Sequence, residues 1–330
     1  MAGLIYSFFQ NNEIMSTKNS LELQGGDDLC ACCGVAAVDD IKLKICDGGC
    51  DLVKYCSDGC QALHEYEHAG ACRKRKEELH DKKIFEQPDS SYLGECPICC
   101  LPLPIDKRKS TLMVCCCKVI CNGCFHANQD RESKDKLKQR CVFCREPLPD
   151  NQEEADEYIN MRLEKNDPVA MTYMGKMHAD EEEYEKALEY YTNAAEMGHA
   201  DALHCLGALY YNGTGVEKDV KKALPYLEKA AIGGQPGARI ILANYEMNCG
   251  RERRAVEHII INANLGCEES LQYVKTSYIR GICSKEDYAA ALRGYQAAIN
   301  EEKSAERQKA EVKRPKVIEG RKKRGLRCSE

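Results

Sequence analysis

The chain has 330 residues, a formal net charge of −6 and 30% charged residues. A chain of this length is expected to form two or three domains, and the mild charge gives no global case for nucleic acid as a partner. No stretch reaches the roughly 18 apolar residues of a membrane span, and Met1 to Gln10 lacks a basic start and a small-residue cleavage site. We therefore expect a protein of the cytoplasm or nucleus, with no membrane partner.

The cysteines are strongly clustered. Of 23 cysteines, eighteen fall between Cys30 and Cys144, which leaves five (23 − 18) for the rest of the chain. In a reducing compartment, clustered cysteines bind metal more often than they pair with each other. Cysteine pairs separated by two residues let a chain turn around a tetrahedral zinc ion, and zinc binding then supplies folding energy. The folding of the segment between Cys30 and Cys144 is therefore predicted to depend on bound metal.

Residues 1–29 are expected to be a flexible N-terminus, and residues 30–72 hold the first cluster. Its candidate ligands are Cys30, Cys33, Cys46, Cys50, Cys56, Cys60, His68 and Cys72. Ser57 can cap a helix that begins near Asp58, and the later ligands then fall at four-residue spacing on one face. His64 shares that spacing, but we interpret it as a surface histidine because the site is already full. Cys32 is interpreted as a spare thiol.

This spacing, with Tyr55-Cys56-Ser57 and Cys60-Gln61, resembles the MYND-type zinc finger. The resemblance implies two interleaved zinc sites and the docking of short proline-containing peptides, without catalysis. The first site would use Cys30, Cys33, Cys56 and Cys60, and the second Cys46, Cys50, His68 and Cys72. Glu65 stands where the family often has Trp, so the rim of any peptide groove is expected to differ.

Residues 73–91 read as a linker. A charged helix is predicted to begin at Arg73, and the stretch from Gln87 to Ser91 is predicted to end it. The basic start of this segment is followed by acidic residues. A solvated face of mixed charge is therefore favoured over a nucleic-acid patch.

Residues 92–150 hold the second cluster, whose order of cysteines resembles a RING-type finger. The resemblance implies that Cys96, Cys99, Cys121 and Cys124 hold one zinc ion. Cys141 and Cys144 would hold the other with two of the triplet Cys115, Cys116 and Cys117. Many such fingers have a histidine at the place of Lys118, and a lysine ammonium cannot ligate zinc. Which two cysteines of the triplet bind stays open, and His126 is a less favoured substitute.

Three residues of this finger match positions that contact a ubiquitin-conjugating enzyme in RING-type ubiquitin ligases. They are Ile98, between the first two ligands, Arg145, directly after the last, and Pro147. Arginine suits that role because its planar fork binds two carbonyl groups at once. In the alternative reading, Ile98 only packs its own turn and Arg145 is an ordinary surface residue.

Residues 151–302 are predicted to be an α-helical repeat solenoid. Asp150 is expected to cap a helix that runs to about Lys165. Alanine or a similar small residue then recurs every 32 or 36 residues, a period typical of stacked helical pairs. The stretch from Ala202 to Gly234 resembles a Sel1-type repeat. The expected pairs are 168–178 with 184–197, 200–211 with 219–232, 236–247 with 252–264, and 268–279 with 286–300.

Residues 303–330 are expected to be a basic disordered tail, although Arg321 to Arg324 also fit a nuclear-import or nucleic-acid patch. The predicted fold class is mainly α: two small zinc-stabilised fingers followed by a helical-repeat solenoid, with about four zinc ions per chain. No catalytic residue is visible. The predicted function is a zinc-dependent protein–protein interaction scaffold. The alternative is a RING-type ubiquitin ligase that recruits substrates through its other modules.

Overall fold

The computed structural model describes residues 29–37 and 42–312, and the chain divides into two compact units, residues 1–82 and 83–330. The first unit contains the antiparallel strands β1 (Lys44–Ile45) and β2 (Lys54–Tyr55), followed by α1 (Asp58–Ile84), which runs on into the second unit. Ser57 caps α1 as predicted, because its Oγ accepts a hydrogen bond from the Cys60 amide at 3.2 Å.

Helix α1 is longer than the sequence suggested. It runs without a break from Asp58 to Ile84, so the prediction of a separate charged helix from Arg73 was wrong about where that helix starts. No proline occurs in α1, and Gly70, three residues before Arg73, does not interrupt it. Arg75 also ties the helix to the preceding loop, because its Nη2 donates to Oδ2 of Asp51 at 2.7 Å.

The second unit begins with a small finger. It comprises the 3₁₀ turn η1 (Lys107–Lys109), the antiparallel pair β3 (Ser110–Met113) and β4 (Lys118–Cys121), and helix α2 (Asn122–Lys134). Its buried core is small, and three of its six residues are cysteines. The core residues are Cys96, Leu103, Met113, Ile120, Cys121 and Cys141. A core of this composition agrees with a module that needs more than apolar packing to fold.

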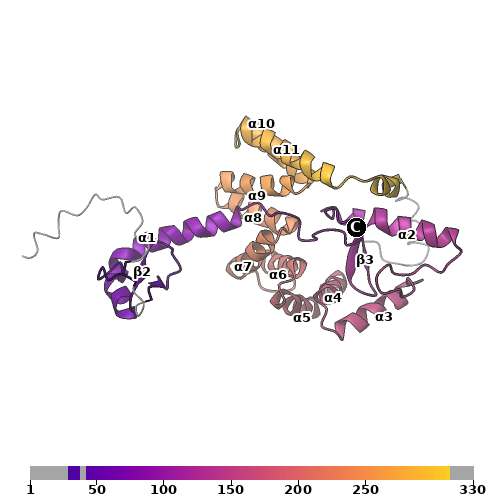
Figure 1. The fold of residues 1–330 in the computed structure, drawn as a ribbon, viewed down its shortest axis with the longest axis horizontal. Helices are drawn as coiled ribbons and strands as arrows, with labels where there is room; N and C mark the ends of the chain where they lie inside the picture. The colour runs from indigo at the N-terminus through magenta and orange to yellow at the C-terminus, as the bar shows by residue number, and fades with distance from the viewer. Residues whose placement is uncertain (1–28, 38–41, 313–330) are drawn as a thin grey trace, which may run out of the picture. The chain divides into compact units, whose positions relative to one another are not determined.

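The predicted solenoid is confirmed. Helix α3 (Gln152–Leu163) precedes four helical pairs that Figure 1 shows stacked one after another. The pairs are α4 (Pro168–Asp180) with α5 (Tyr184–Glu196), α6 (Ala200–Asn212) with α7 (Val220–Ile232), α8 (Pro236–Asn248) with α9 (Glu252–Asn264), and α10 (Glu268–Ile279) with α11 (Lys285–Glu301). The predicted cap of α3 was wrong by one residue: Asn151, not Asp150, accepts from the Glu154 amide at 2.9 Å.

Small residues let the helices of each pair approach closely. The recurring alanines are fully buried, among them Ala187, Ala223 and Ala255. A Cβ on Gly207 would lie 2.7 Å from Cγ of Leu227 on the facing helix. Glycine is favoured there, because a larger side chain would force Leu227 or its helix to shift. The repeat period therefore reflects positions where one helix crosses the next.

The end of α1 and the segment that follows it, predicted as part of a linker, pack against the repeats. Ile84 is 2% exposed, and the fully buried Arg239 of α8 donates to the carbonyl oxygens of Ile84 and Glu86 at 2.9 and 3.4 Å. The guanidinium of Arg254 lies over the Phe85 ring, 4.8 Å from its centroid. These contacts hold the segment that leads into the finger against the surface of the solenoid.

The finger itself also contacts the repeats. Nζ of Lys107 lies 3.0 Å from Oδ2 of Asp201 on α6, and Gln235 donates to the same carboxylate at 3.1 Å. Asp201 is largely buried, which opposes ionisation, but Lys176 and Lys107 together hold its pKa below the usual range. The carboxylate is therefore charged at neutral pH and joins the finger to the solenoid.

The chain folds back after α11. Residues 305–312 are helical, so the prediction of disorder from residue 303 was wrong for this part of the tail. The Arg321–Arg324 patch lies outside the described residues. Among the helices that are described, none is both long and apolar enough to cross a membrane.

Candidate metal centres

Three of the cysteine pairs share one backbone geometry. In each, the amide four residues after the first cysteine donates to the carbonyl of that cysteine: Gly34 to Cys30 at 2.9 Å, Cys100 to Cys96 at 2.8 Å, and Arg145 to Cys141 at 3.1 Å. The donor residues have positive φ angles of 72°, 54° and 63°. This tight turn aims both sulfurs of a pair toward one point, as a metal centre requires.

In the first unit, eight side chains converge in two groups of four. Cys30, Cys33, Cys56 and Cys60 form one group, and Cys46, Cys50, His68 and Cys72 form the other; within each group the donor atoms lie within 4.8 Å of one another. The two groups alternate along the chain, which is the interleaved arrangement that the resemblance implied. Helix α1 serves both, since Cys60 belongs to the first group and His68 and Cys72 to the second.

The pKa values of Cys30 and His68 are shifted toward the forms that bind metal, whereas a hydrogen bond with Cys33 raises the pKa of Cys56 to about 12 and burial raises that of Cys72 to about 11. Burial opposes ionisation of Cys30, but backbone amides of Cys33 and Cys56 overcome it and lower its pKa to about 6. Burial lowers the pKa of His68, so its ring is neutral at pH 7. A thiolate and a neutral imidazole are the forms that bind zinc. His64, expected at the surface, is half-buried; it bonds to the Tyr55 hydroxyl at 3.0 Å and belongs to neither group.

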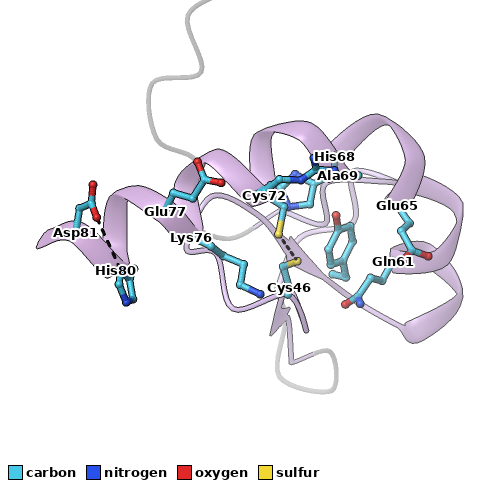
Figure 2. Close-up of a pocket in the computed structure, with 13 residues that line it drawn as sticks. Cys46, Gln61, Glu65, His68, Ala69, Cys72, Lys76, Glu77, His80 and Asp81 are labelled. Atoms are coloured by element: carbon cyan, nitrogen blue, oxygen red, sulfur yellow. Dashed lines mark hydrogen bonds and ion pairs between the residues drawn. The ribbon is translucent and has the colours of Figure 1, made fainter. Parts of the chain in front are cut away.

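A pocket lies beside the second group, along α1. Figure 2 shows Cys46 and Cys72 pointing toward each other at its floor, with Gln61 and Glu65 at one end. Lys76 and Glu77 border the other end. Glu65, which stands where the family often has tryptophan, lines this pocket.

In the second unit, the finger brings together two further groups. Cys96, Cys99, Cys121 and Cys124 form one, and Cys115, Cys116, Cys141 and Cys144 form the other. The structure therefore decides which members of the triplet converge. Cys115 lies 3.3 Å from Cys144, and Cys116 lies 3.7 Å from Cys141, measured between sulfurs.

Cys117 is not part of the group. Its side chain is buried with Ile159 of α3 and Ala170 of α4, so the third cysteine of the triplet packs the finger onto the solenoid. Lys118 also has a different role, because its ammonium lies 4.7 Å from the Phe143 ring centroid. His126, the less favoured substitute, bonds to Oε1 of Gln129 at 3.1 Å and stays outside both groups.

One cysteine in each finger group is biased toward the thiolate. Burial opposes ionisation of Cys96, but the amides of Cys121, Cys99 and Ile98 lower its pKa to about 7. A hydrogen bond from the Cys115 thiol is the main cause that lowers the pKa of Cys141 to about 4. The first proton to leave each group would therefore come from a buried sulfur that is already hydrogen-bonded.

The donor separations fit zinc. A tetrahedron with zinc–sulfur bonds of about 2.3 Å places its sulfurs about 3.8 Å apart. Representative sulfur–sulfur distances are 3.5 Å for Cys33 and Cys56, 3.7 Å for Cys46 and Cys72, and 3.8 Å for Cys99 and Cys121. All cysteines in the described part of the chain are free thiols. Four soft donors at this spacing in each of four groups can hold a metal ion.

The three predicted partner-binding residues have different environments. Ile98 is 44% exposed, and Arg145 is exposed with its backbone fixed by the turn that follows Cys141. Pro147 is half-buried, and its carbonyl accepts a hydrogen bond from the Tyr158 hydroxyl at 3.1 Å. The Ile98 and Arg145 side chains are therefore accessible from solvent.

Sequence reasoning missed two further features. His178, Glu181 and Glu183 lie near one another between α4 and α5, but Glu183 is bonded to His178 at 2.7 Å and to Lys186 at 2.8 Å, as in an ordinary ion-pair network. Arg307 contacts Cys99 across 208 positions of sequence. No local pattern could indicate a contact of that range.

The comparison with protein families bears on the solenoid. The family model "Sel1 repeat" matches residues 168–199 and 200–235, which correspond to α4 with α5 and α6 with α7. The chain carries Sel1 repeats. The pairs α8 with α9 and α10 with α11 continue the same stack beyond the matched residues. No family model of a MYND-type or RING-type finger matches the chain.

Two solved structures illustrate the likeness. A Sel1 repeat protein from Oxalobacter formigenes is 20% identical, with a TM-score of 0.40, over 58% of this chain and 86% of that one. The protein c5321, a protective antigen with an SLR fold from uropathogenic Escherichia coli, is 21% identical, with a TM-score of 0.35, over 62% of this chain and 49% of that one. Sel1 repeat proteins are typically protein–protein interaction scaffolds.

Proposed function

We propose that this chain is a zinc-dependent protein–protein interaction scaffold, with a MYND-type finger at residues 30–72 and a RING-type finger at residues 92–150. The observation that carries the proposal is the convergence of sixteen side chains into four groups of four soft donors. Each group has enough ligands to close a zinc site, which is typical of structural rather than catalytic zinc. The free thiols suit a reducing compartment, so the cytoplasm or nucleus is the proposed location.

Zinc would act through folding. The finger cores are small and rich in cysteine, so bound metal would supply stability that apolar packing does not. The ligands come from distant parts of each finger; Cys99 and Cys121, for example, are separated by 22 positions. Holding such residues together fixes the surfaces that a partner would contact.

Metal analysis of the purified full chain tests this directly. We expect about four zinc ions per chain, one for each group of donors. Cys33→Ser and Cys46→Ser should each lower the count by about one, because they disrupt different groups. Cys32→Ser, a change at an exposed cysteine outside the groups, should keep all of them. Native protein without zinc, or with these cysteines joined in disulfides, would contradict the proposal.

The pocket along α1 is the proposed peptide-docking site of the first finger. It lies beside the Cys46 group and is about 620 Å³ in volume, with Gln61 and Glu65 on its rim. We expect Glu65→Trp to strengthen binding of short proline-containing peptides, since proline packs well on aromatic rings. Glu67→Trp is the matched control, because Glu67 is exposed on the same helix but does not line the pocket. Equal binding by both variants in fluorescence polarisation would remove this assignment.

A second candidate function is ubiquitin ligation by the RING-type finger. The observation that favours it is that Ile98 and Arg145 stay exposed although the finger is packed against the solenoid on other sides. Burial of the exposed Ile98 side chain against a ubiquitin-conjugating enzyme would contribute to binding. The first finger and the repeats would then recruit the substrate.

Self-ubiquitination with a panel of conjugating enzymes tests the ligase. Ile98→Ala and Arg145→Ala should each reduce activity strongly. Leu137→Ala and Arg131→Ala are matched controls, because both residues are exposed on the same finger and neither matches a contact position. Activity that is the same in all four variants would refute the mechanism, and absence of activity with every enzyme would leave the scaffold alone.

A further inference from the structure

The helix at residues 305–312 returns from the end of the solenoid to the finger. Ser304 caps it, since its Oγ accepts from the Arg307 amide at 3.2 Å. Figure 1 shows this short helix beside α2. The contact is close: a Cβ on Gly123 would lie only 2.7 Å from the Arg307 amide nitrogen. Gly123 stands between the ligands Cys121 and Cys124, so this helix packs directly on one of the metal centres.

Arg307 reaches from this helix into the loop that follows Cys99. Its Nη1 donates to the carbonyl oxygens of Pro102 and Glu302 at 2.8 and 3.0 Å. Its Nη2 donates to the carbonyl of Leu101 at 3.2 Å and to Sγ of Cys99 at 3.5 Å. The side chain is 9% exposed. Arginine fits this position because its rigid fork satisfies several acceptors at once.

Within the described residues no carboxylate lies at ion-pair distance from the buried guanidinium; its charge acts on the partly buried Glu302 carboxyl only through space. None of the ion pairs found among residues 29–37 and 42–312 includes Arg307, and its Nε is buried without a hydrogen-bond partner there. An unpaired buried charge is costly. Four thiolates around a divalent zinc ion carry a net charge of −2. The loaded Cys96 group would therefore supply the negative charge that the guanidinium otherwise lacks.

We propose that Arg307 is a positioning residue of this metal centre: it donates to the Cys99 thiolate, offsets its negative charge, and docks the C-terminal helix on the loaded finger. The proposal rests on the proposed zinc binding by Cys96, Cys99, Cys121 and Cys124. It assigns the segment after α11 a role in retaining metal, in place of the free tail expected from its composition. A residue of this kind, beside but not among the ligands, typically changes metal affinity 10- to 100-fold.

The test compares the zinc-loaded full chain with Arg307→Ala, Arg307→Lys and Arg293→Ala. Arg293 is an exposed arginine of α11 and serves as the matched control. With a chromophoric chelator in excess, Arg307→Ala should release one of its zinc ions about 10-fold faster or more, while Arg293→Ala behaves as the wild type. Arg307→Lys keeps the charge but loses the fork, so its rate should lie between the two.

Two readouts separate this role from general loosening. In the cobalt-substituted protein, Arg307→Ala should shift part of the thiolate-to-cobalt charge-transfer band, because one thiolate loses a charged hydrogen-bond donor. Hydrogen exchange should rise in peptides covering 96–102 and 304–312, but not around the second centre of the same finger, at Cys141 and Cys144.

The possible outcomes distinguish a failure of the role proposed for Arg307 from a failure of the proposed zinc binding. Four zinc ions in every variant, with release rates and cobalt spectra of Arg307→Ala equal to those of Arg293→Ala, would overturn the role of Arg307 and leave zinc binding intact. Equal acceleration of all zinc ions in Arg307→Ala would also overturn it, because that result indicates global unfolding. Wild-type protein without zinc would remove the proposed function and this inference together.

Discussion

The triplet Cys115-Cys116-Cys117 offers the sharpest test of the structure. Cys116 lies 3.7 Å from Cys141 and helps to close a loop of 25 positions. In the chain-entropy account of cross-links, closing such a loop contributes about 3 kcal/mol to the free energy of unfolding. We therefore expect Cys116→Ala to lose one zinc ion and to lower the free energy of unfolding of the second unit by about that amount.

Cys117→Ala should behave differently. Its sulfur is buried against Ile159 and Ala170, outside the metal group. Deleting one buried atom of this size costs about 1 kcal/mol. For a unit of this size, that corresponds to a fall in Tm of about 2–4 °C, against about three times as much for Cys116→Ala.

The assay combines metal analysis with thermal unfolding followed by circular dichroism. Cys249→Ala, at an exposed cysteine of the solenoid, controls for the loss of a thiol as such. The expected zinc counts are about three for Cys116→Ala and about four for both Cys117→Ala and the control. Loss of one zinc ion from Cys117→Ala, together with a full count in Cys116→Ala, would show that the assignment of the triplet is wrong.

Three further results are expected. Gly207→Ala should destabilise the solenoid by about 1–3 kcal/mol, because its Cβ would meet Leu227 at 2.7 Å. Gly70→Ala, on an open face of α1, should instead stabilise its helix by about 0.5–1 kcal/mol. Calorimetry that reversed this order would refute the packing argument. Burial lowers the pKa of His204 to about 4, below the unfolded value of about 6.5. The unfolded chain therefore binds more protons between these pH values, so stability falls as pH drops, by about 2 kcal/mol at pH 5; His204→Gln should lack this component, and identical pH profiles in urea unfolding would count against it. Arg239→Ala should raise hydrogen exchange at residues 84–92, since it removes two hydrogen bonds that hold this segment on the solenoid; unchanged exchange there would contradict the anchoring role.

The ligands of the first finger show how much of a metal site can be predicted from the spacing of residues along the chain. Cys60, His68 and Cys72 had to share a helix face once Ser57 capped that helix, and the structure distributes them between two groups as the resemblance implied. The recurring alanines likewise predicted the helical pairs to within two residues at each end. Both patterns depend on the fixed geometry of an α-helix, which a sequence records directly.

The sequence by itself therefore determined the modules, their order and fourteen of the sixteen ligand positions now seen in groups, with the last two left open within one triplet. Only the tertiary structure decided that Cys115 and Cys116 face Cys144 and Cys141, while Cys117 turns toward the solenoid. Three adjacent cysteines have the same chemistry, and they differ only in the direction of their side chains. The contacts of Arg239 with Ile84 and of Arg307 with Cys99 were hidden for a related reason. They join residues far apart in the chain, and such pairs meet only after the helices have packed.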